Sequence, residues 1–160
     1  IGKIRKSLDK NKFYDVQILS YAVKYASNFY GPFRDAIGSS TNLGATDKSS
    51  YQMDIGNGDE AIREASLDIS EGADILMVKP GMPYLDIVYR LKNNFPVPIF
   101  VYQVSGEFKM LNCLAGKDKT YLTKLIIESL VAFKRAGATA IISYFSESIV
   151  KILPSSKLKA

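Results

Sequence analysis

The sequence predicts an α/β fold made of four successive strand–helix units, which is half of a (β/α)8 TIM barrel. Short apolar runs that suit buried parallel strands alternate with longer segments of helical periodicity. Polar or glycine-rich sequence separates the strands from the helices that follow them. The chain has 160 residues, whereas a complete barrel of this type typically needs roughly 250 residues. We therefore expect residues 1–160 to form about half of a single barrel domain.

The first unit begins with residues 16–23 (VQILSYAV), an apolar run expected to form a buried strand. Residues 31–58 are rich in Gly, Ser, Thr, Asn and Asp and have no apolar period, so we expect a long loop there. Long loops of this kind in compact domains are usually lids or binding loops. A helix is expected from Asp59 until Gly72 stops it.

The remaining units follow the same order. The expected strands are residues 75–78 (ILMV), 99–104 (IFVYQV) and 140–144 (AIISY). The expected helices are one that begins near Pro83, one over about residues 120–136 that ends at Gly137, and a short one over residues 147–153. Strand, loop and helix in repetition indicate a parallel sheet that is covered by helices.

A flavodoxin-like doubly wound sheet is the alternative architecture, and it suits the chain length better. Such folds usually carry a phosphate-binding loop after the first strand, and this sequence has none there. Residues 56–61 (GNGDEA) do match the G-x-G-x-x-A pattern of dinucleotide-binding proteins. No convincing strand precedes that match, so we favour the half-barrel.

The composition excludes several kinds of catalysis within this chain. There is no histidine, so neither a Ser-His-Asp nor a Cys-His nucleophile can be assembled from its residues. The single cysteine, Cys113, cannot form a disulfide within the chain or build a structural zinc site. Acid–base chemistry must therefore come from Lys, Tyr, Asp or Glu.

The charge balance is basic, with 21 Lys and Arg against 16 Asp and Glu and a net charge of +5. Much of the surplus lies near the two ends, in residues 2–12 and 155–160. Scattered terminal lysines are typical of a solvated surface, and there is no basic stripe interleaved with aromatic residues, so we expect no nucleic-acid partner. No apolar run approaches the roughly 18 residues of a membrane span, so we expect no membrane partner either.

Two lysines end buried strands, Lys24 after LSYAV and Lys79 after ILMV. Catalytic groups of a barrel lie at the C-terminal ends of its strands, and lysine is seldom buried without a reason. Burial and a neighbouring ammonium group both lower the pKa of an amine, and a neutral amine can attack a ketone to form a Schiff base. A strand-end lysine can also simply extend into solvent, but two at consecutive strand ends favour a Schiff-base site.

Four segments carry a resemblance to a known family. Residues 20–36 (SYAVKYASNFYGPFRDA) and 72–88 (GADILMVKPGMPYLDIV) resemble two signature segments of the porphobilinogen synthase family, also called 5-aminolevulinate dehydratase. Residues 101–108 (VYQVSGEF) and 136–145 (AGATAIISYF) are similar to the same family in the same order. The resemblance covers almost the whole chain, and MVKPGMPYLD is its most specific part.

The resemblance implies that the chain is the C-terminal half of a (β/α)8 barrel that commonly assembles as a homo-octamer. The implied enzyme is a lyase that condenses and dehydrates two 5-aminolevulinate molecules asymmetrically to porphobilinogen, an early step of tetrapyrrole and heme biosynthesis. Lys79 matches the lysine that forms the Schiff base in the P-site, where the first substrate is held. Lys24 matches the second lysine, assigned to the A-site substrate, and would help to keep Lys79 deprotonated.

Five further residues match substrate-binding positions of the family. Arg34, Lys48 and Gln52 match lid positions that grip the A-site carboxylate. Position 48 is arginine in some members, so lysine there keeps the charge and loses the bidentate geometry. Ser105 and Tyr144 match the hydroxyl groups that bind the P-site carboxylate. By themselves, Arg34 and Lys48 would be ordinary solvated residues, Ser105 a helix cap and Tyr144 a half-buried core phenol. The aromatic residues expected to be pocket wall or core, without a catalytic role, are Tyr30, Phe33 and Tyr102.

Glu64 matches the glutamate that, in one branch of the family, joins an outer-sphere allosteric magnesium at the subunit interface. A glutamate on a helix is also commonly solvated, or here paired with Arg63. The cysteine-rich or aspartate-rich metal segment of the family is expected upstream of this chain, so both magnesium and zinc stay open for the active site. Abundant Lys, Asn and Ile, together with Glu64, favour a plastid-type (apicoplast or chloroplast) member over a cytoplasmic one.

Two other functions stay open. Another Schiff-base aldolase-type lyase would also need a strand-end lysine, although two lysines and a basic lid favour two carboxylate-bearing substrates. The second is a catalytically incomplete half-barrel that acts only as an assembly partner. An open four-stranded sheet has two free edges, which favours pairing with another half.

Overall fold

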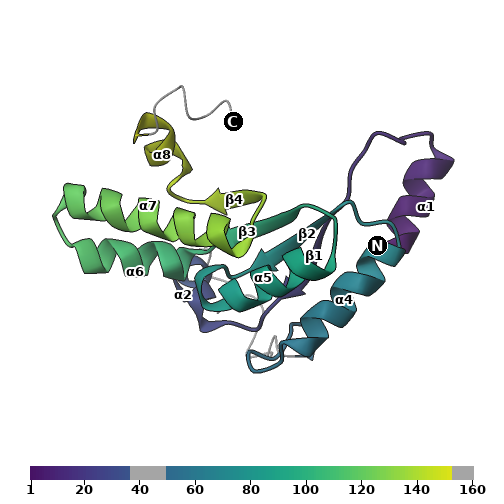
Figure 1. Cartoon of the computed structure of the whole chain (residues 1–160), viewed down its shortest axis with the longest axis horizontal. Coiled ribbons are helices and arrows are strands. Elements are labelled where there is room, and N and C mark those ends of the chain that lie inside the picture. The colour runs from purple at the N-terminus through teal and green to yellow at the C-terminus, as the bar shows by residue number, and fades with distance from the viewer. Residues whose placement is uncertain (37–49, 153–160) are drawn as a thin grey trace.

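Four parallel strands form one sheet in the order β1-β2-β3-β4 (Figure 1). The computed structural model describes residues 1–36 and 50–152. The strands are β1 (Leu19–Lys24), β2 (Ile75–Lys79), β3 (Ile99–Gln103) and β4 (Ala140–Ser143). Each strand pairs in parallel with the next one along the chain, which is the arrangement of consecutive units of a (β/α)8 barrel. The four strands expected from the sequence are confirmed, and no strand terminus differs from its expected position by more than three residues.

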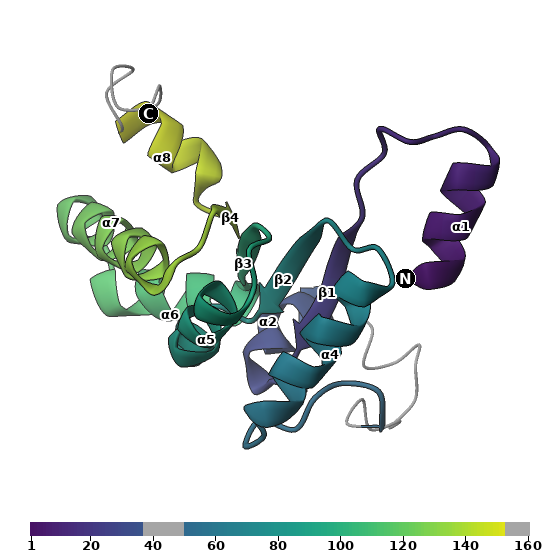
Figure 2. The ribbon, with the colours of Figure 1, turned by 45° about the vertical axis from the view of Figure 1, so that its right-hand side comes forward.

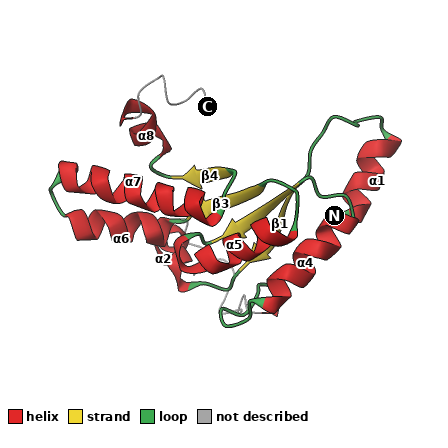
Figure 3. Cartoon of the chain, viewed as in Figure 1, coloured by secondary structure: helices red, strands yellow, loops and turns green. Residues whose placement is uncertain are grey.

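Helices make the connections between the strands (Figure 3). The connecting elements are α4 (Asp59–Ser70) between β1 and β2, η3 (Met82–Tyr84) and α5 (Leu85–Asn94) between β2 and β3, and α6 (Ser105–Ala115) and α7 (Lys119–Ala136) between β3 and β4. The last helix, α8 (Ser146–Ile152), follows β4. No helix among the described residues is both long enough and apolar enough to cross a membrane.

The hydrophobic core lies between one face of the sheet and the helices α4, α5 and α7. It joins strand residues such as Val78 and Val101 to Ala65 of α4, Leu91 of α5 and Phe133 of α7, all of which have no exposed surface. The opposite face is open, and Tyr21 of β1 and Ile142 of β4 are 46% and 36% exposed there. A sheet with one covered and one open face is what half of a barrel provides, because the interior of a barrel is filled by side chains from all of its strands.

A short helix occupies the start of the segment that the sequence predicts as a loop. The turn η1 (Asn28–Tyr30) continues directly into α2 (Gly31–Ala36). Ser27 begins the turn, because its hydroxyl oxygen accepts the backbone N–H of Phe29 at 3.1 Å. The expected loop over residues 31–58 is therefore corrected at its beginning. The helix escapes prediction because it is short and contacts α6, so tertiary packing contributes more to it than local propensity.

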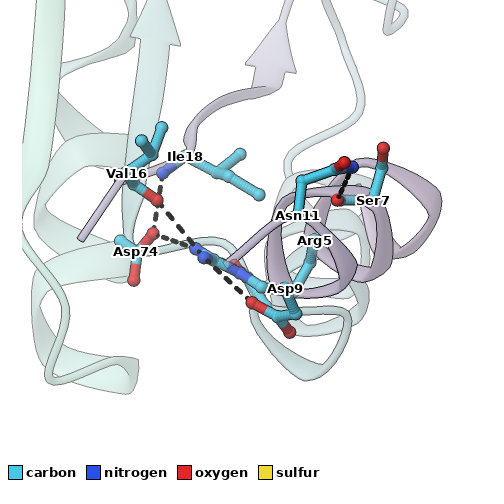
Figure 4. A network of polar contacts seen from close by, with 8 residues as sticks. Arg5, Ser7, Asp9, Asn11, Val16, Ile18 and Asp74 are labelled. Carbon is cyan, nitrogen blue, oxygen red and sulfur yellow. Dashed lines mark hydrogen bonds and ion pairs between the residues drawn. The ribbon is translucent and has the colours of Figure 1, made fainter. Parts of the chain in front are cut away.

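The charged N-terminal stretch forms a helix, α1 (Gly2–Lys10), that has no buried residue. Arg5 attaches it to the sheet (Figure 4), donating to the Asp74 carboxylate at 2.5 Å and to the Val16 carbonyl oxygen at 3.2 Å. The same carboxylate accepts the N–H of Ile18 at 2.7 Å. Because Ile18 and Asp74 directly precede β1 and β2, this network holds the starts of the two strands together. Figure 2 shows α1 beyond β1 and α8 beyond β4, at the two edges of the sheet.

Candidate active site

The two strand-end lysines are neighbours. Lys24 and Lys79 are the last residues of β1 and β2, and they are partners in the parallel register. Adjacent strands lie about 4.8 Å apart, so the two side chains start from neighbouring backbone positions. Burial lowers the pKa of Lys79, and the positive charge of Lys24 lowers it further. A lowered pKa increases the fraction of neutral amine, which is the form that attacks a ketone.

Tyrosine rings surround the amine of Lys79. Its Nζ lies 3.9 Å from the centre of the Tyr102 ring, 5.5 Å from that of Tyr21 and 5.8 Å from that of Tyr30. The Tyr30 hydroxyl also donates a hydrogen bond to the Lys79 carbonyl oxygen at 3.0 Å. Ring faces attract cations, so these rings act against the two effects that lower the pKa. They also restrict the positions that the amine can take.

A pocket at the ends of β2, β3 and β4 contains the residues that the sequence assigns to the first substrate. We call it the Lys79 pocket, and its lining residues are Lys79, Ser105, Tyr144, Tyr30, Phe33, Tyr102 and Val104. The structure thus brings together the candidate Schiff-base lysine and both candidate carboxylate-binding hydroxyl groups. The three aromatic residues expected as pocket wall or core line this pocket.

The two hydroxyl groups of the Lys79 pocket can both donate hydrogen bonds. Burial raises the pKa of Tyr144, and the neighbouring Tyr102 raises it further, so the phenol stays protonated. The Ser105 oxygen accepts the backbone N–H of Phe33 at 3.0 Å and keeps its own proton for donation. Helix α6 starts at Ser105 with Val104 as its cap residue, so Ser105 is not the helix cap that its position allows. The pair can therefore bind a carboxylate.

The backbones of the turn η1 and of helix α6 approach each other closely. A Cβ atom at Gly106 would lie 2.3 Å from the carbonyl oxygen of Phe29, so only glycine fits there. This approach brings the N–H of Phe33 to Ser105. Arg34 is the next residue of α2, so its backbone lies close to the Lys79 pocket.

A second pocket lies beside the end of β1, and we call it the Lys24 pocket. Its lining residues are Lys24, Gln52, Glu64, Tyr21, Ala22, Ser50, Tyr51, Met53 and Glu60. The segment that carries Gln52 is brought there by Met53, whose N–H donates to the Lys24 carbonyl oxygen at 3.0 Å. Gln52 is 8% exposed, and its Oε1 has no hydrogen-bond partner within residues 1–36 and 50–152. Lys24 and Gln52, both predicted to bind the A-site substrate, thus line one pocket. Lys48, predicted for the same substrate, lies outside the described residues.

Glu64 provides one carboxylate to the Lys24 pocket, and Arg63 pairs with it at 3.3 Å. In the part of the chain that the structure describes, no three His, Cys, Asp or Glu residues form a group that could hold a metal ion. Magnesium usually keeps several waters and takes only one or two carboxylates. Glu64 therefore fits an outer-sphere contact with magnesium, and does not by itself form a closed metal site.

Sequence reasoning missed Glu107, which is completely buried at the start of α6. Burial raises the pKa of its carboxyl group, although hydrogen bonds from the backbone of Met82, Val104 and Gly81 act in the opposite direction. Glu107 is the third residue after Val104, the cap residue of α6, and a glutamate at this spacing can accept the backbone N–H of the cap residue. That spacing is the sequence signal that could have identified Glu107.

Comparisons with known proteins agree with this arrangement. The family described as Delta-aminolevulinic acid dehydratase matches residues 1–152. A relative of that name from Bradyrhizobium diazoefficiens is 58% identical over 146 residues, which are 91% of this chain and 41% of the relative. A rice relative named "Delta-aminolevulinic acid dehydratase, chloroplastic" is 46% identical over 153 residues, which are 96% of this chain and 35% of the relative.

A solved structure with the same fold is the delta-aminolevulinic acid dehydratase (porphobilinogen synthase) of Toxoplasma gondii ME49 in complex with the reaction product porphobilinogen. It is 45% identical, with a TM-score of 0.90 over 99% of this chain and 46% of that chain. The chain therefore spans less than half the length of the relatives that it matches, and the strand–helix units it contains are those of half a barrel.

Proposed function

The chain belongs to the delta-aminolevulinic acid dehydratase family, and on this premise we propose that it supplies the lysine-bearing half of a porphobilinogen synthase. The proposed reaction is the asymmetric condensation and dehydration of two 5-aminolevulinate molecules to porphobilinogen, in tetrapyrrole and heme biosynthesis. The observation that carries the proposal is the pairing of Lys24 with Lys79 at the strand ends, together with the lowered pKa of Lys79.

In the proposed reaction, the neutral amine of Lys79 attacks the ketone carbon of the first 5-aminolevulinate. Loss of one water molecule then gives the Schiff base between Nζ and that carbon. The hydroxyl groups of Tyr144 and Ser105 bind the carboxylate of this substrate, because both can donate into the Lys79 pocket. The tyrosine walls limit water around the imine and hold the substrate against the lysine.

The second 5-aminolevulinate occupies the Lys24 pocket in this proposal. Lys24 forms the second Schiff base, and its positive charge, added to burial, lowers the pKa of Lys79 and so favours the neutral amine. The amide NH2 group of Gln52, which lines this pocket, donates to the second carboxylate. Arg34 and Lys48 supply positive charge from the lid.

We also propose that Glu64 contributes to an outer-sphere magnesium contact, as its single accessible carboxylate allows. When bound, the metal would add positive charge beside the Lys24 pocket. Magnesium or zinc at the active site of the complete enzyme, a homo-octameric assembly, and a plastid or cytoplasmic location remain parts of the proposal. The names of the rice and Chlamydomonas reinhardtii relatives call those proteins chloroplastic.

The experiment that tests the proposal uses a complete barrel. This chain replaces the matching segment of the Bradyrhizobium diazoefficiens relative, and porphobilinogen formation from 5-aminolevulinate is followed by a colour reaction for pyrroles. We expect turnover by the chimera, and its loss to background when Lys79 is replaced by alanine. The matched control is Lys124→Ala, which removes an exposed lysine of α7 and should leave the rate unchanged.

The open alternatives give different results in the same experiment. A chain that serves only as an assembly partner would give a folded chimera that forms no porphobilinogen, or one whose rate does not change in Lys79→Ala. Another aldolase-type lyase would form a Lys79 Schiff base with ketones or aldehydes that carry no carboxylate, and would not release a pyrrole. Either result on a folded chimera would contradict the proposed function.

A further inference from the structure

Glu107 is a buried carboxylate that the proposed reaction does not use. Its side chain has no exposed surface. One oxygen, Oε1, accepts the backbone N–H of Met82 at 2.5 Å. The other, Oε2, accepts the N–H of Val104 at 2.5 Å and that of Gly81 at 3.3 Å. Three donors on one carboxylate are enough to keep a buried acidic group in place.

These three donors come from two different strand ends. Gly81 and Met82 follow Lys79 and Pro80 at the end of β2, whereas Val104 lies between β3 and Ser105. The carboxylate of Glu107 therefore links the loop that carries the lysine to the start of the helix that carries Ser105. Both of those residues line the Lys79 pocket.

The loop after Lys79 packs tightly against the core. A Cβ atom at Gly81 would lie 2.6 Å from side-chain atoms of both Phe133 and Val101, so glycine lets the loop approach the core. A glycine backbone has no side chain with which to fix its own position. The hydrogen bonds to Glu107 supply that restraint from the neighbouring helix.

We propose that Glu107 is a positioning residue, which clamps the loop after β2 to the start of α6 and so sets where the Lys79 amine lies relative to Ser105 and Tyr102. The inference rests on the proposed function, in which Lys79 forms the Schiff base. Without the clamp, the amine becomes more hydrated, which raises its pKa, and it is no longer held where it reaches the ketone. Both changes slow its addition to a ketone, since misplacement of a reacting group by about 1 Å can reduce rates roughly a hundredfold.

The competing explanation is that Glu107 only caps helix α6 through the N–H of Val104. Two substitutions separate the explanations. Glu107→Asp keeps an acidic group in the first turn, where it favours the helix, but is one methylene too short to span to the Met82 loop. Glu107→Gln keeps the shape and turns one of the two acceptors into a donor that would face N–H groups. The control is Asp118→Ala, which removes the side-chain cap of α7, where Asp118 accepts the N–H of Tyr121 at 2.9 Å.

Two measurements are made on the chain and on the chimera described above. The first is competitive labelling of lysines with trace acetic anhydride over a pH series, read by mass spectrometry, which gives the pKa of Lys79 without any substrate. The second is the rate of borohydride trapping of 5-aminolevulinate on Lys79. Circular dichroism confirms that each variant is folded, and if Glu107→Gln does not fold, the Glu107→Asp result decides.

We expect both Glu107 variants to raise the pKa of Lys79 towards its ordinary value and to slow trapping roughly ten- to a hundredfold. Asp118→Ala should lower the thermal midpoint and change neither quantity. If Glu107→Asp matches the wild-type chain in both measurements, or if Asp118→Ala produces the same changes, the clamp is wrong. If the wild-type chimera traps no substrate while the labelling differences persist, the proposed function fails and the clamp on Lys79 stands.

Discussion

Lys24 and Lys79 occupy the same register position at the ends of two adjacent parallel strands. This pairing places the two lysines side by side at the carboxyl ends of β1 and β2, where the two pockets lie. The repulsion between them, added to burial, is what lowers the pKa of Lys79. The relationship follows from strand register, and a shift of one residue would turn one lysine to the opposite face.

Replacing Lys24 should therefore raise the pKa of Lys79. In Lys24→Met the neighbouring positive charge is lost, so the reactive neutral amine appears only at higher pH. The measurement is the pH profile of acetic anhydride labelling at Lys79. Lys24→Arg is the control, because it keeps the charge and should keep the profile near that of the wild-type chain. A profile that Lys24→Met leaves unchanged would contradict the proposed coupling.

At pH values where Lys79 is protonated, its buried positive charge should lower the free energy of unfolding of the chain. Because its pKa is lower in the folded state than the ordinary 10.5, the folded chain binds fewer protons than the unfolded chain between those two values. Stability therefore rises with pH through that window. Lys79→Met should raise the free energy of unfolding at neutral pH, and the gain should disappear above about pH 10.5. Urea unfolding at both pH values measures this, with Lys124→Met as the exposed control that should show no such pH-dependent gain.

The contact between α6 and the turn η1 should not tolerate a side chain at position 106. Gly106→Ala would place a methyl group against the Phe29 carbonyl oxygen, so we expect a loss of about 1–3 kcal/mol in the free energy of unfolding. The shifted backbone should also break the hydrogen bond between Phe33 and Ser105 and weaken carboxylate binding. Gly31→Ala is the matched control, because a Cβ there meets no atom within 4 Å. Equal stability of the two variants in urea unfolding would argue against the close approach.

Arg5 should contribute to stability more than a surface charge does. Its guanidinium donates to the Asp74 carboxylate and to the Val16 carbonyl oxygen (Figure 4). It also donates to the carbonyl oxygen of Gly72. Arg5→Ala should cost about 2 kcal/mol, since hydrogen bonds to charged groups contribute about 1.5–3 kcal/mol. Lys3→Ala, on the exposed side of the same helix, should change the urea midpoint little. Matching losses in the two variants would mean that α1 is not held by this network.

The strand ends were predictable because apolar runs stop sharply there. Lys24 and Lys79 each follow such a run, so the sequence alone could assign both to the same edge of a parallel sheet. That they are register partners required the structure, because strand pairing depends on contacts between residues far apart in the chain. Ser105, Tyr144 and Gln52 likewise matched family positions, and only the structure could place them in particular pockets.

Other features gave weaker signals in the sequence. Helix α1 has few apolar residues, and its attachment through Arg5 to residues before β1 and β2 is a tertiary effect. The short helix α2 lies in a sequence rich in turn-forming residues. Glu107 escaped notice because glutamate is almost never fully buried unless its carboxylate is paired, and its donors Gly81 and Met82 come from another strand end.

The most direct test of the central claim is to trap the Schiff base. The chain is incubated with 5-aminolevulinate, reduced with borohydride and mapped by mass spectrometry, while circular dichroism confirms that it is folded. We expect an adduct on Lys79 that depends on substrate and disappears in Lys79→Ala, with the complete chimera trapping faster than the chain alone. A folded chimera that forms no adduct on Lys79, or forms it equally on exposed lysines such as Lys124, would contradict the assignment of Lys79 as the Schiff-base lysine.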